Sequence, residues 1–241
     1  MVTYDIKEKL CIALDVDNIE EAIRLARVLV SSVGIFKVGK QLFTKEGPRV
    51  IKEIINIGGK VFLDLKYHDI PNTVASAAKE VVKLGVHMFN IHASGGSEMM
   101  QATVEAVNKE AQKLGTAKPL ILAVTVLTSI NDYMLTTELG VRRELTEHVV
   151  YLANLAKHSG INGVVASPQE IQAIRNNCGK DFIILTPGIR PLWSTKDDQK
   201  RVTTPKEAIA LGADYIVVGR PILKADNPVE AANKILEDMT V

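Results

Sequence analysis

The sequence has little cysteine, no excess of charge of either sign and no long hydrophobic run. Its 241 residues include only two cysteines, Cys11 and Cys178, which lie far apart, so we expect neither a disulfide framework nor a cysteine metal site. The 29 basic and 28 acidic residues leave a formal net charge of +1, which gives no general attraction to nucleic acid or to an anionic membrane. No apolar stretch approaches the roughly 18 residues of a membrane span, and the mixed, charged N-terminus is unlike a secretory signal. A soluble, cytoplasmic protein is expected.

What the sequence does have is alternation between two kinds of segment. Hydrophobic residues make up 46% of the chain, and they concentrate in short runs that favour β-strands, at residues 10–16, 34–39, 60–66, 86–93, 120–128, 161–167, 181–187 and 214–220. Between these runs lie segments with apolar residues at helical spacing, such as 19–30, 71–85, 95–115 and 228–239. Several of these segments end on glycine, as helix C-termini often do.

Strands that alternate with helices predict a parallel sheet with right-handed crossovers. Eight strand–helix units in one chain of this length predict a closed (β/α)8 barrel, the TIM-barrel fold, as a single α/β domain over residues 1–241. The main competitor is an open doubly wound sheet. Such a sheet usually carries a G-x-G-x-x-G turn after its first strand, whereas here that turn reads DVDNIE at residues 15–20.

Polar residues occur at the carboxyl end of almost every predicted strand. In a (β/α)8 barrel the active site lies at this end of the strands, so we interpret these residues as candidates for function. They are Asp15, Lys37, Asp64, Lys66, His92, Ser94, Thr128, Ser129, Ser167, Thr186 and Arg220.

The third strand is the most informative. Side chains two residues apart point to the same face of a strand, so Phe62, Asp64 and Lys66 share one face. The uninterrupted apolar set on the other face belongs against the helices, which directs Asp64 and Lys66 into the barrel mouth. An internal salt bridge is the alternative interpretation of this pair. Lys37 and Asp15 bring further charge to the same mouth, where neighbouring charges control each other's protonation.

The remaining strand-end histidines, His68 and His92, are interpreted as structural hydrogen bonders. No histidine–cysteine cluster has metal-ligand spacing, so no metal is expected.

The segment after the seventh strand, TPGIRPLWSTKDDQKR at residues 186–201, is too long and too rich in proline, glycine and charge for a simple connector. We interpret residues 187–203, approximately, as a lid. The eighth strand ends in VVGRPI, where Gly219 permits close approach of a ligand and Arg220 can bind an anion through two hydrogen bonds. Together with Arg190 and Gln199, these residues predict a site for a phosphate monoester, with a solvated charged loop as the alternative.

The ordered set of motifs resembles the orotidine 5'-phosphate decarboxylase family from about Cys11 to Pro228. The motifs are ALD (13–15), FKVGKQLF (36–43), FLDLKYHDIPNT (62–73), HASGG (92–96), AVTVLTS (123–129), TPGIRP (186–191), DQKR (198–201) and GRPI (219–222). The resemblance implies decarboxylation of orotidine 5'-phosphate to UMP, the last step of de novo pyrimidine nucleotide biosynthesis, without a cofactor.

The resemblance also implies a role for each matching residue. The charged tetrad of the family falls on Lys37, Asp64, Lys66 and Asp69. Asp15 and Lys37 would bind the ribose, Thr128, Ser129 and Pro187 the pyrimidine, and Arg190, Gln199, Gly219 and Arg220 the phosphate. Asp69, with Ile70 and Thr73, would reach into the partner's site in a homodimer with shared active sites.

In the mechanism that this implies, Lys66 stabilises a carbanion at C6 of the pyrimidine and then protonates it, while Asp64 and Asp69 keep the lysine charged. Two other hypotheses remain. One is a Mg²⁺-dependent sugar-phosphate decarboxylase or aldolase of the related barrel group, although Lys37 stands where that group places a metal-binding carboxylate. The other is a barrel that binds a nucleotide without chemistry.

Overall fold

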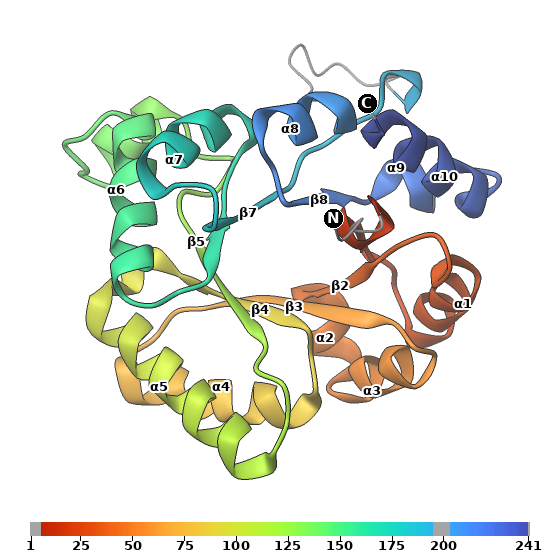
Figure 1. Cartoon of the computed structure of the whole chain (residues 1–241), viewed down its shortest axis with the longest axis horizontal. Helices are drawn as coiled ribbons and strands as arrows, with labels where there is room; N and C mark the ends of the chain where they lie inside the picture. Colours follow the sequence, from red (N-terminus) through yellow and green to blue (C-terminus); the bar gives the residue numbers. More distant parts are fainter. Residues whose placement is uncertain (1–5, 195–202, 241) are drawn as a thin grey trace.

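The computed structural model describes residues 6–194 and 203–240. Eight parallel strands close into a barrel in which each strand pairs with the strands before and after it, and β1 pairs with β8. The strands form the inner ring and the helices lie outside it (Figure 1). The strands are β1 (Leu10–Ala13), β2 (Ile35–Gly39), β3 (Lys60–Tyr67), β4 (Met88–His92), β5 (Leu120–Val124), β6 (Gly163–Val165), β7 (Ile183–Thr186) and β8 (Tyr215–Val218).

The helices follow the strands in the order that the sequence predicts. They are α1 (Ile19–Leu29), α2 (Lys40–Glu46), α3 (Arg49–Asn56), α4 (Pro71–Leu84), α5 (Gly96–Leu114), α6 (Leu145–His158), α7 (Ile171–Cys178), α8 (Pro205–Leu211), α9 (Arg220–Leu223) and α10 (Pro228–Met239). Short 3-10 helices are η1 (Ile6–Lys9), η2 (Ala93–Gly95), η4 (Pro168–Glu170) and η5 (Leu192–Ser194), and η3 (Met134–Glu138) is a π-helix. The (β/α)8 barrel prediction is therefore confirmed.

Most strands are shorter at their carboxyl ends than the hydrophobic runs suggest. The first run was expected to extend to residue 16, but β1 ends at Ala13, and β5 ends at Val124. The next residue of each still donates one hydrogen bond to the neighbouring strand, from Leu14 N–H to the Lys37 carbonyl and from Thr125 N–H to the Val165 carbonyl. The chain then enters the loops of the barrel mouth, so the apolar runs extend beyond the sheet.

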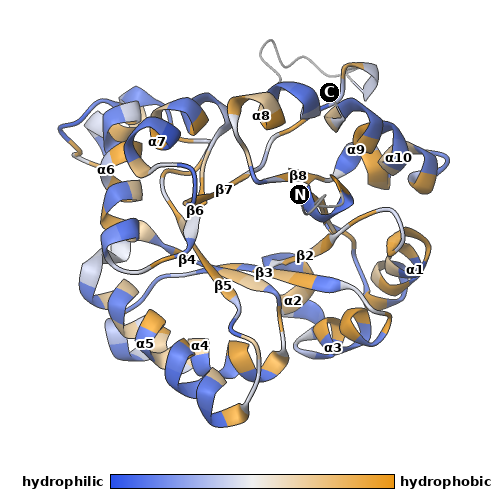
Figure 2. Ribbon diagram, viewed as in Figure 1, coloured by the Kyte–Doolittle hydropathy of each residue, from blue (hydrophilic) through white to orange (hydrophobic). Residues whose placement is uncertain are grey.

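The core has two parts, one on each face of the sheet. Inside the barrel, side chains of alternate residues such as Cys11, Phe62 and Met88 pack against each other. Between the sheet and the helices lies the larger cluster, which includes Val61 and Leu63 of β3. The strands are mostly hydrophobic, and the helices carry both hydrophobic and hydrophilic residues (Figure 2), as one-sided burial requires.

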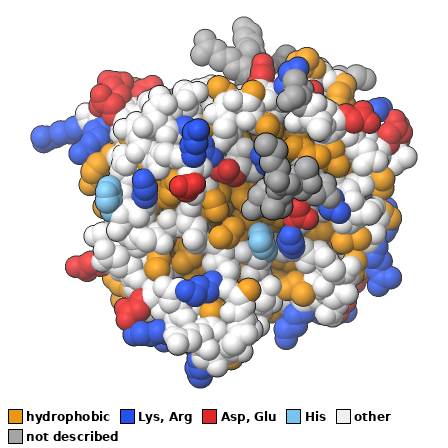
Figure 3. Space-filling model, viewed as in Figure 1, with side chains coloured by type: hydrophobic (Ala, Val, Ile, Leu, Met, Phe, Trp, Pro, Cys, Tyr) orange, Lys and Arg blue, Asp and Glu red, His pale blue; other side chains and the backbone are white. Residues whose placement is uncertain are grey.

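Both cysteines are buried and free. Acidic and basic side chains are interspersed on the face of the molecule in Figure 3, in keeping with the net charge of +1. Among residues 6–194 and 203–240, no helix combines the length and the apolar character needed to cross a bilayer.

Candidate active site

A cavity of about 190 Å³ opens at the carboxyl ends of the strands. Three charged side chains and a ring of apolar ones line it, so that the charges face a space with little other polar surface. The lining residues are Lys37, Phe62, Asp64, Lys66, Val124, Val126, Leu127, Thr128, Val165, Ala166, Leu185, Pro187 and Val217.

The Lys37 amine of β2 lies between two carboxylates, Asp15 just after β1 and Asp64 of β3. Its Nζ atom lies 3.2 Å from Asp15 Oδ1 and 3.4 Å from Asp64 Oδ2. Burial disfavours the charged amine, but the carboxylates of Asp64 and Asp15 outweigh it and raise the pKa of Lys37 above its usual value. Lys37 is therefore a fixed positive charge.

Asp64 and Lys66 form the closest pair in the cavity, with Lys66 Nζ 2.5 Å from Asp64 Oδ1. Both side chains face the cavity, as the alternation of β3 predicts. Burial opposes ionisation of Asp64, but Lys37 and Lys66, with hydrogen bonds from Lys66 and Asn90, hold its pKa below the usual value. The carboxylate therefore stays charged between two lysines.

Lys66 has an unusual backbone conformation. Its φ of 53° makes it the one non-glycine residue with positive φ among the described parts of the chain. Its N–H donates to Asn90 Oδ1 at 2.8 Å, and Asn90 Nδ2 donates to Asp64 Oδ1 at 2.7 Å. Sequence reasoning missed Asn90, although a polar residue within the apolar run MFNI at residues 88–91 was a signal.

The structure does not bring Asp69 to Lys66 within one chain. Asp69 is exposed beyond the end of β3, and its Oδ1 accepts the N–H of Ile70 at 2.7 Å. Ile70 is 67% exposed, and Thr73 in the first turn of α4 is also exposed. These three residues therefore lie together on the surface.

Only some of the residues predicted to bind the pyrimidine line the cavity. Thr128 and Pro187 line the cavity, whereas Ser129 lies in the adjoining turn and does not line it. Thr186, expected at the mouth, faces the other way because Leu185 next to it points into the barrel. The Thr186 hydroxyl is buried and has no hydrogen-bond partner among the residues that the structure describes.

The predicted phosphate residues lie around a second cavity, of about 350 Å³. Arg190 and Arg220 both line it, and Gly219 directly precedes α9. A side chain at Gly219 would come within 3.9 Å of Asp15 Oδ2, so this cavity adjoins the Asp15–Lys37 pair. Gln199, with residues 195–202 of the predicted lid, lies outside the described residues.

His68 and His92 lie beside each other, with ring centroids 5.3 Å apart. Burial, and then the neighbouring charges of His68, Lys40 and Lys66, lower the pKa of His92 to about 4. His92 is therefore neutral at pH 7. Among residues 6–194 and 203–240, no three histidine, cysteine or acidic side chains form a group that could hold a metal ion.

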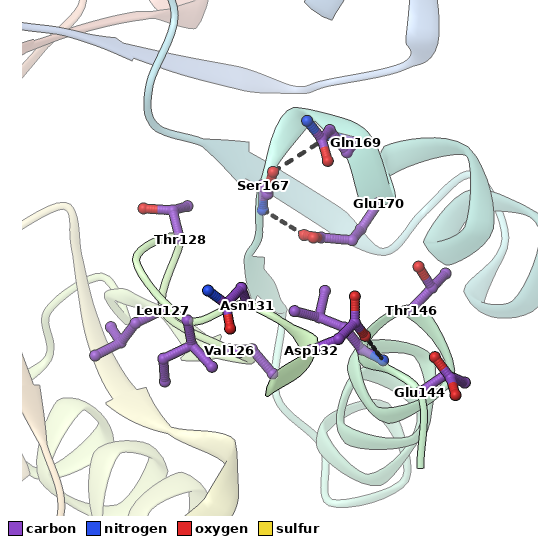
Figure 4. Close-up of a pocket in the computed structure, with 12 residues that line it drawn as sticks. Val126, Leu127, Thr128, Asn131, Asp132, Glu144, Thr146, Ser167, Gln169 and Glu170 are labelled. Atoms are coloured by element: carbon purple, nitrogen blue, oxygen red, sulfur yellow. Dashed lines mark hydrogen bonds between the residues drawn. The ribbon is translucent and has the colours of Figure 1, made fainter. Parts of the chain in front are cut away.

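A third cavity, of about 390 Å³, lies beside the first and shares Thr128 with it (Figure 4). Glu170 of η4 lines this cavity, is only 5% exposed and accepts the N–H of Ser167 at 2.7 Å. Burial raises the pKa of Glu170 to about 7, despite that hydrogen bond. Ser167 follows Ala166, which lines the charged cavity, so Glu170 supports one wall of it.

Comparison with known proteins assigns this arrangement to a family. Residues 8–235 match the model of the "Orotidine 5'-phosphate decarboxylase / HUMPS family". The chain belongs to this family. It is 56% identical over 234 residues to an orotidine 5'-phosphate decarboxylase of Syntrophomonas wolfei, covering 97% of this chain and 98% of that protein. It is also 52% identical to one of Geotalea daltonii, over 99% of each.

Solved structures of similar chains have the same fold. An orotidine 5'-phosphate decarboxylase from Lactobacillus acidophilus superposes with a TM-score of 0.83 at 40% identity, covering 96% of this chain and 99% of that one. An uncharacterized conserved protein from Geobacillus kaustophilus superposes with a TM-score of 0.85 at 37% identity, covering 96% of this chain and 100% of that one. The charged cavity thus lies in a barrel of the orotidine 5'-phosphate decarboxylase family.

Proposed function

We propose that this chain is a cytoplasmic enzyme that decarboxylates orotidine 5'-phosphate to UMP and CO2, the last step of de novo pyrimidine nucleotide biosynthesis. The observation that carries the proposal is the placement of Lys66, whose ammonium group lies against Asp64 at the wall of a largely apolar cavity. In such surroundings a positive charge interacts strongly with a negative charge that develops nearby. The identity of the substrate is inferred from the family to which the chain belongs.

The reaction breaks the bond between C6 of the pyrimidine and its carboxylate. CO2 leaves, and the electron pair of that bond stays on C6 as a carbanion in the plane of the ring. Lys66 stabilises this carbanion as a cation and then transfers a proton from Nζ to C6, which gives UMP. The neutral amine regains its proton from solvent. Every group in this sequence of steps comes from the protein, the substrate or solvent, so the reaction needs no cofactor.

Asp64 keeps Lys66 charged and in place. It is itself held ionised by Lys37 and Lys66, which lower its pKa against the effect of burial. A neutral Lys66 would provide neither the stabilising charge nor the proton, so the lysine depends on the carboxylate that it contacts.

A second copy of the chain completes the site in this proposal. Asp69, Ile70 and Thr73 of each chain are exposed together, and a large side chain such as Ile70, 67% exposed, favours a covered position. In a homodimer, the partner subunit's Asp69 would approach Lys66 from the side opposite Asp64. Lys66 would then lie between two carboxylates from different subunits.

The remaining residues bind the rest of the nucleotide. Asp15 and Lys37 are assigned to the ribose hydroxyls, and Thr128, Ser129 and Pro187 to the pyrimidine. Arg190, Gln199, Gly219 and Arg220 are assigned to the phosphate. The two arginines line one cavity beside Asp15, which supports a continuous site from phosphate to ring.

Phosphate binding also contributes to turnover in this proposal. Enzymes accelerate slow reactions by up to about 10¹⁷-fold, equivalent to about 23 kcal/mol, and a few charges at C6 are too few to account for a value near that limit. Binding energy from the phosphate can organise the site in the transition state, with the segment 187–203 acting as a lid. Orotidine without its phosphate should therefore lose kcat as well as affinity.

A Mg²⁺-dependent reaction of a related barrel enzyme is the rival. Lys37 argues against it, because its Nζ lies 3.4 Å from Asp64 Oδ2 and would repel a divalent cation there. The test follows the loss of ultraviolet absorption of orotidine 5'-phosphate with the purified protein, with and without EDTA. We expect equal rates in both. Absence of turnover would refute the proposed reaction, and loss of turnover in EDTA would favour the rival.

Mixing two inactive variants tests the shared site. Lys66→Ala and Asp69→Ala homodimers each have two defective sites. A heterodimer would have one site with both substitutions and one with neither. Random exchange of subunits makes half of the dimers heterodimers, so the mixture should recover about a quarter of wild-type activity. Recovery no greater than the sum of the separate variants would refute the contribution of Asp69 across the interface.

A further inference from the structure

Strand β3 leaves the regular ladder at the residues proposed for catalysis. Leu63 pairs with Phe89 and Tyr67 pairs with Ile91, with a shift of register between them. Asp64, Leu65 and Lys66 on β3 therefore lie opposite a single residue of β4, which is Asn90. A bulge of this kind leaves backbone groups without their normal partners and changes the direction of a side chain.

Asn90 replaces the missing partner. The Lys66 N–H donates to the Asn90 side-chain oxygen at 2.8 Å, in place of a backbone carbonyl of β4. The same side chain donates from Nδ2 to Asp64 Oδ1 at 2.7 Å, the oxygen that also accepts from Lys66 Nζ. Asn90 thus holds both the backbone of Lys66 and the carboxylate that contacts its amine.

The chemistry of these contacts fixes the orientation of the amide. A backbone N–H can only donate and a carboxylate can only accept, so the two ends of the Asn90 amide cannot be exchanged. The residue is fully buried, at 0% exposure, and lies on the same side of β4 as Met88 of the inner core. Bulk solvent therefore does not reach this amide.

Lys66 requires this support because of its backbone. A φ of 53° at a non-glycine residue is disfavoured and persists only where the surrounding structure holds it. The hydrogen bond from its N–H to Asn90 is a contact that does so. Without it, the lysine can return to an extended conformation, which would point its amine away from the position next to Asp64.

We propose that Asn90 is a positioning residue, which holds Lys66 in the left-handed conformation and Asp64 in contact with it and so sets the geometry for protonation at C6. This inference rests on the proposed function, because it concerns the same lysine. It adds a residue of β4 that does not itself line the charged cavity.

The inference includes a dependence on pH. Hydrogen bonds from Asn90 and Lys66 act with the charges of Lys37 and Lys66 to lower the pKa of Asp64. Other titratable groups interact with this set, namely Cys11 and Asp15, through Lys37, and His92 of β4. All of them are retained when Asn90 alone is replaced. Loss of the Asn90 donor should therefore raise the pH at which activity is lost on the acid side.

The test compares Asn90→Leu with Asn162→Leu. Asn162 is the control, because its Oδ1 also accepts a backbone N–H of a neighbouring strand, from Ile121 of β5 at 2.9 Å. It is exposed and precedes β6 at the opposite end of the barrel. Misplacement of a reacting group by about 1 Å can cost about 10²-fold in rate. We expect the kcat of Asn90→Leu to fall by about this factor, while its KM stays within about threefold of wild type. The pH below which activity is lost, the acid limb of the pH profile, should be higher than in wild type. Asn162→Leu should keep kcat and the pH profile even if its melting temperature falls.

A second variant decides the matter if Asn90→Leu does not fold. Asn90→Asp keeps the shape and the acceptor for Lys66 N–H but places a carboxylate against Asp64, and two adjacent carboxyls do not both ionise readily. We expect its acid limb to move up by more than one pH unit. A wild-type profile and kcat in the folded variant would overturn the inference. Wild-type enzyme is assayed alongside: if it does not decarboxylate the substrate, the proposed function fails, whereas an active wild type with an unaffected variant refutes Asn90 alone.

Discussion

Two ion pairs lie at opposite ends of this barrel, and their partners differ in kind. Arg175 of α7 and Asp214 before β8 form one pair at the amino-terminal end of the strands. Asp64 and Lys66 form the other at the carboxyl-terminal end. Both pairs are partly shielded from solvent. The side chains of Arg175 and Asp214 are 12% and 37% exposed, and those of Asp64 and Lys66 are 13% and 24% exposed. Burial alone therefore does not distinguish them.

The Arg175–Asp214 pair is enclosed by backbone groups. Arg175 donates to the carbonyl oxygens of Gly179, Lys180, Phe182 and Gly212. The Asp214 carboxylate accepts the Ile184 N–H at 2.8 Å. Such a pair connects the loops that precede β7 and β8, so it contributes to the fold.

The Asp64–Lys66 pair faces a cavity. Its charges contact Lys37 and one side-chain amide, and its lysine has the strained backbone conformation described above. Strained residues and charges that face open space cost stability and occur mainly where function requires them. The comparison shows that the partners of a buried pair, more than its burial, separate a structural role from a chemical one.

The largest effect that separates the two pairs is expected from Asp64→Asn. The substitution keeps the shape but removes the negative charge that contacts the Lys66 amine, so under the proposed mechanism kcat/KM should fall by about 10²–10⁴-fold. The measurement is decarboxylation under substrate excess and at limiting substrate. Asp214→Asn is the matched control, and its turnover per folded molecule should equal that of wild type. Equal losses in both variants would contradict the separation.

The reverse effect is expected from Arg175→Leu. The substitution leaves Asp214 without its cation and several carbonyl oxygens without their donor. Breaking a buried ion pair in this way costs about 3–5 kcal/mol in the free energy of unfolding. Because Asp214 is partly exposed, we expect a loss at the low end, about 3 kcal/mol. Urea unfolding measures it. Lys109→Leu breaks the exposed pair with Glu105 and should cost at most about 1 kcal/mol. If Arg175→Leu lowered kcat but left the free energy of unfolding unchanged, the structural role given to Arg175 would be wrong.

A smaller effect concerns Glu170, which supports the wall beside Thr128. Burial raises its pKa from 4.5 to about 7 in the folded protein, so the native state binds more protons than the unfolded state between these values. Its contribution to stability is therefore present below about pH 4.5 and is lost as pH rises to about 7.

Glu170→Gln removes this titration. The stability of wild type relative to the variant should fall by about 1–3 kcal/mol between pH 4.5 and pH 8. Glu170 forms a capping box with Ser167, and Glu207 forms a second one with Thr204. Hydrogen bonds from Thr204 lower the pKa of the exposed Glu207 carboxyl. In the control Glu207→Gln, the stability of wild type relative to the variant should therefore change with pH in the opposite direction. A flat difference for Glu170→Gln would show that the carboxyl titrates normally.

The sequence predicted those features of the site that follow from local periodicity. The alternation of β3 placed Asp64 and Lys66 on one face, and the order of strands brought Lys37 to them. Thr186 was misplaced, because its direction depends on the parity of a short strand whose limits were uncertain by a residue. Asn90 was missed because its role depends on a bulge in a neighbouring strand, which is a tertiary feature. Asp69 was identified through family resemblance, and the contact proposed for it involves a second chain, which one sequence does not describe.

The most direct test of the central claim is the turnover of Lys66→Ala with orotidine 5'-phosphate in the presence of EDTA. The variant lacks both the cation and the proton donor, so we expect it to fold, to bind the nucleotide and to lose decarboxylation by several orders of magnitude. Thermal unfolding and a binding titration with UMP establish that fold and site are intact. Turnover within tenfold of wild type in that folded, nucleotide-binding variant would contradict the account.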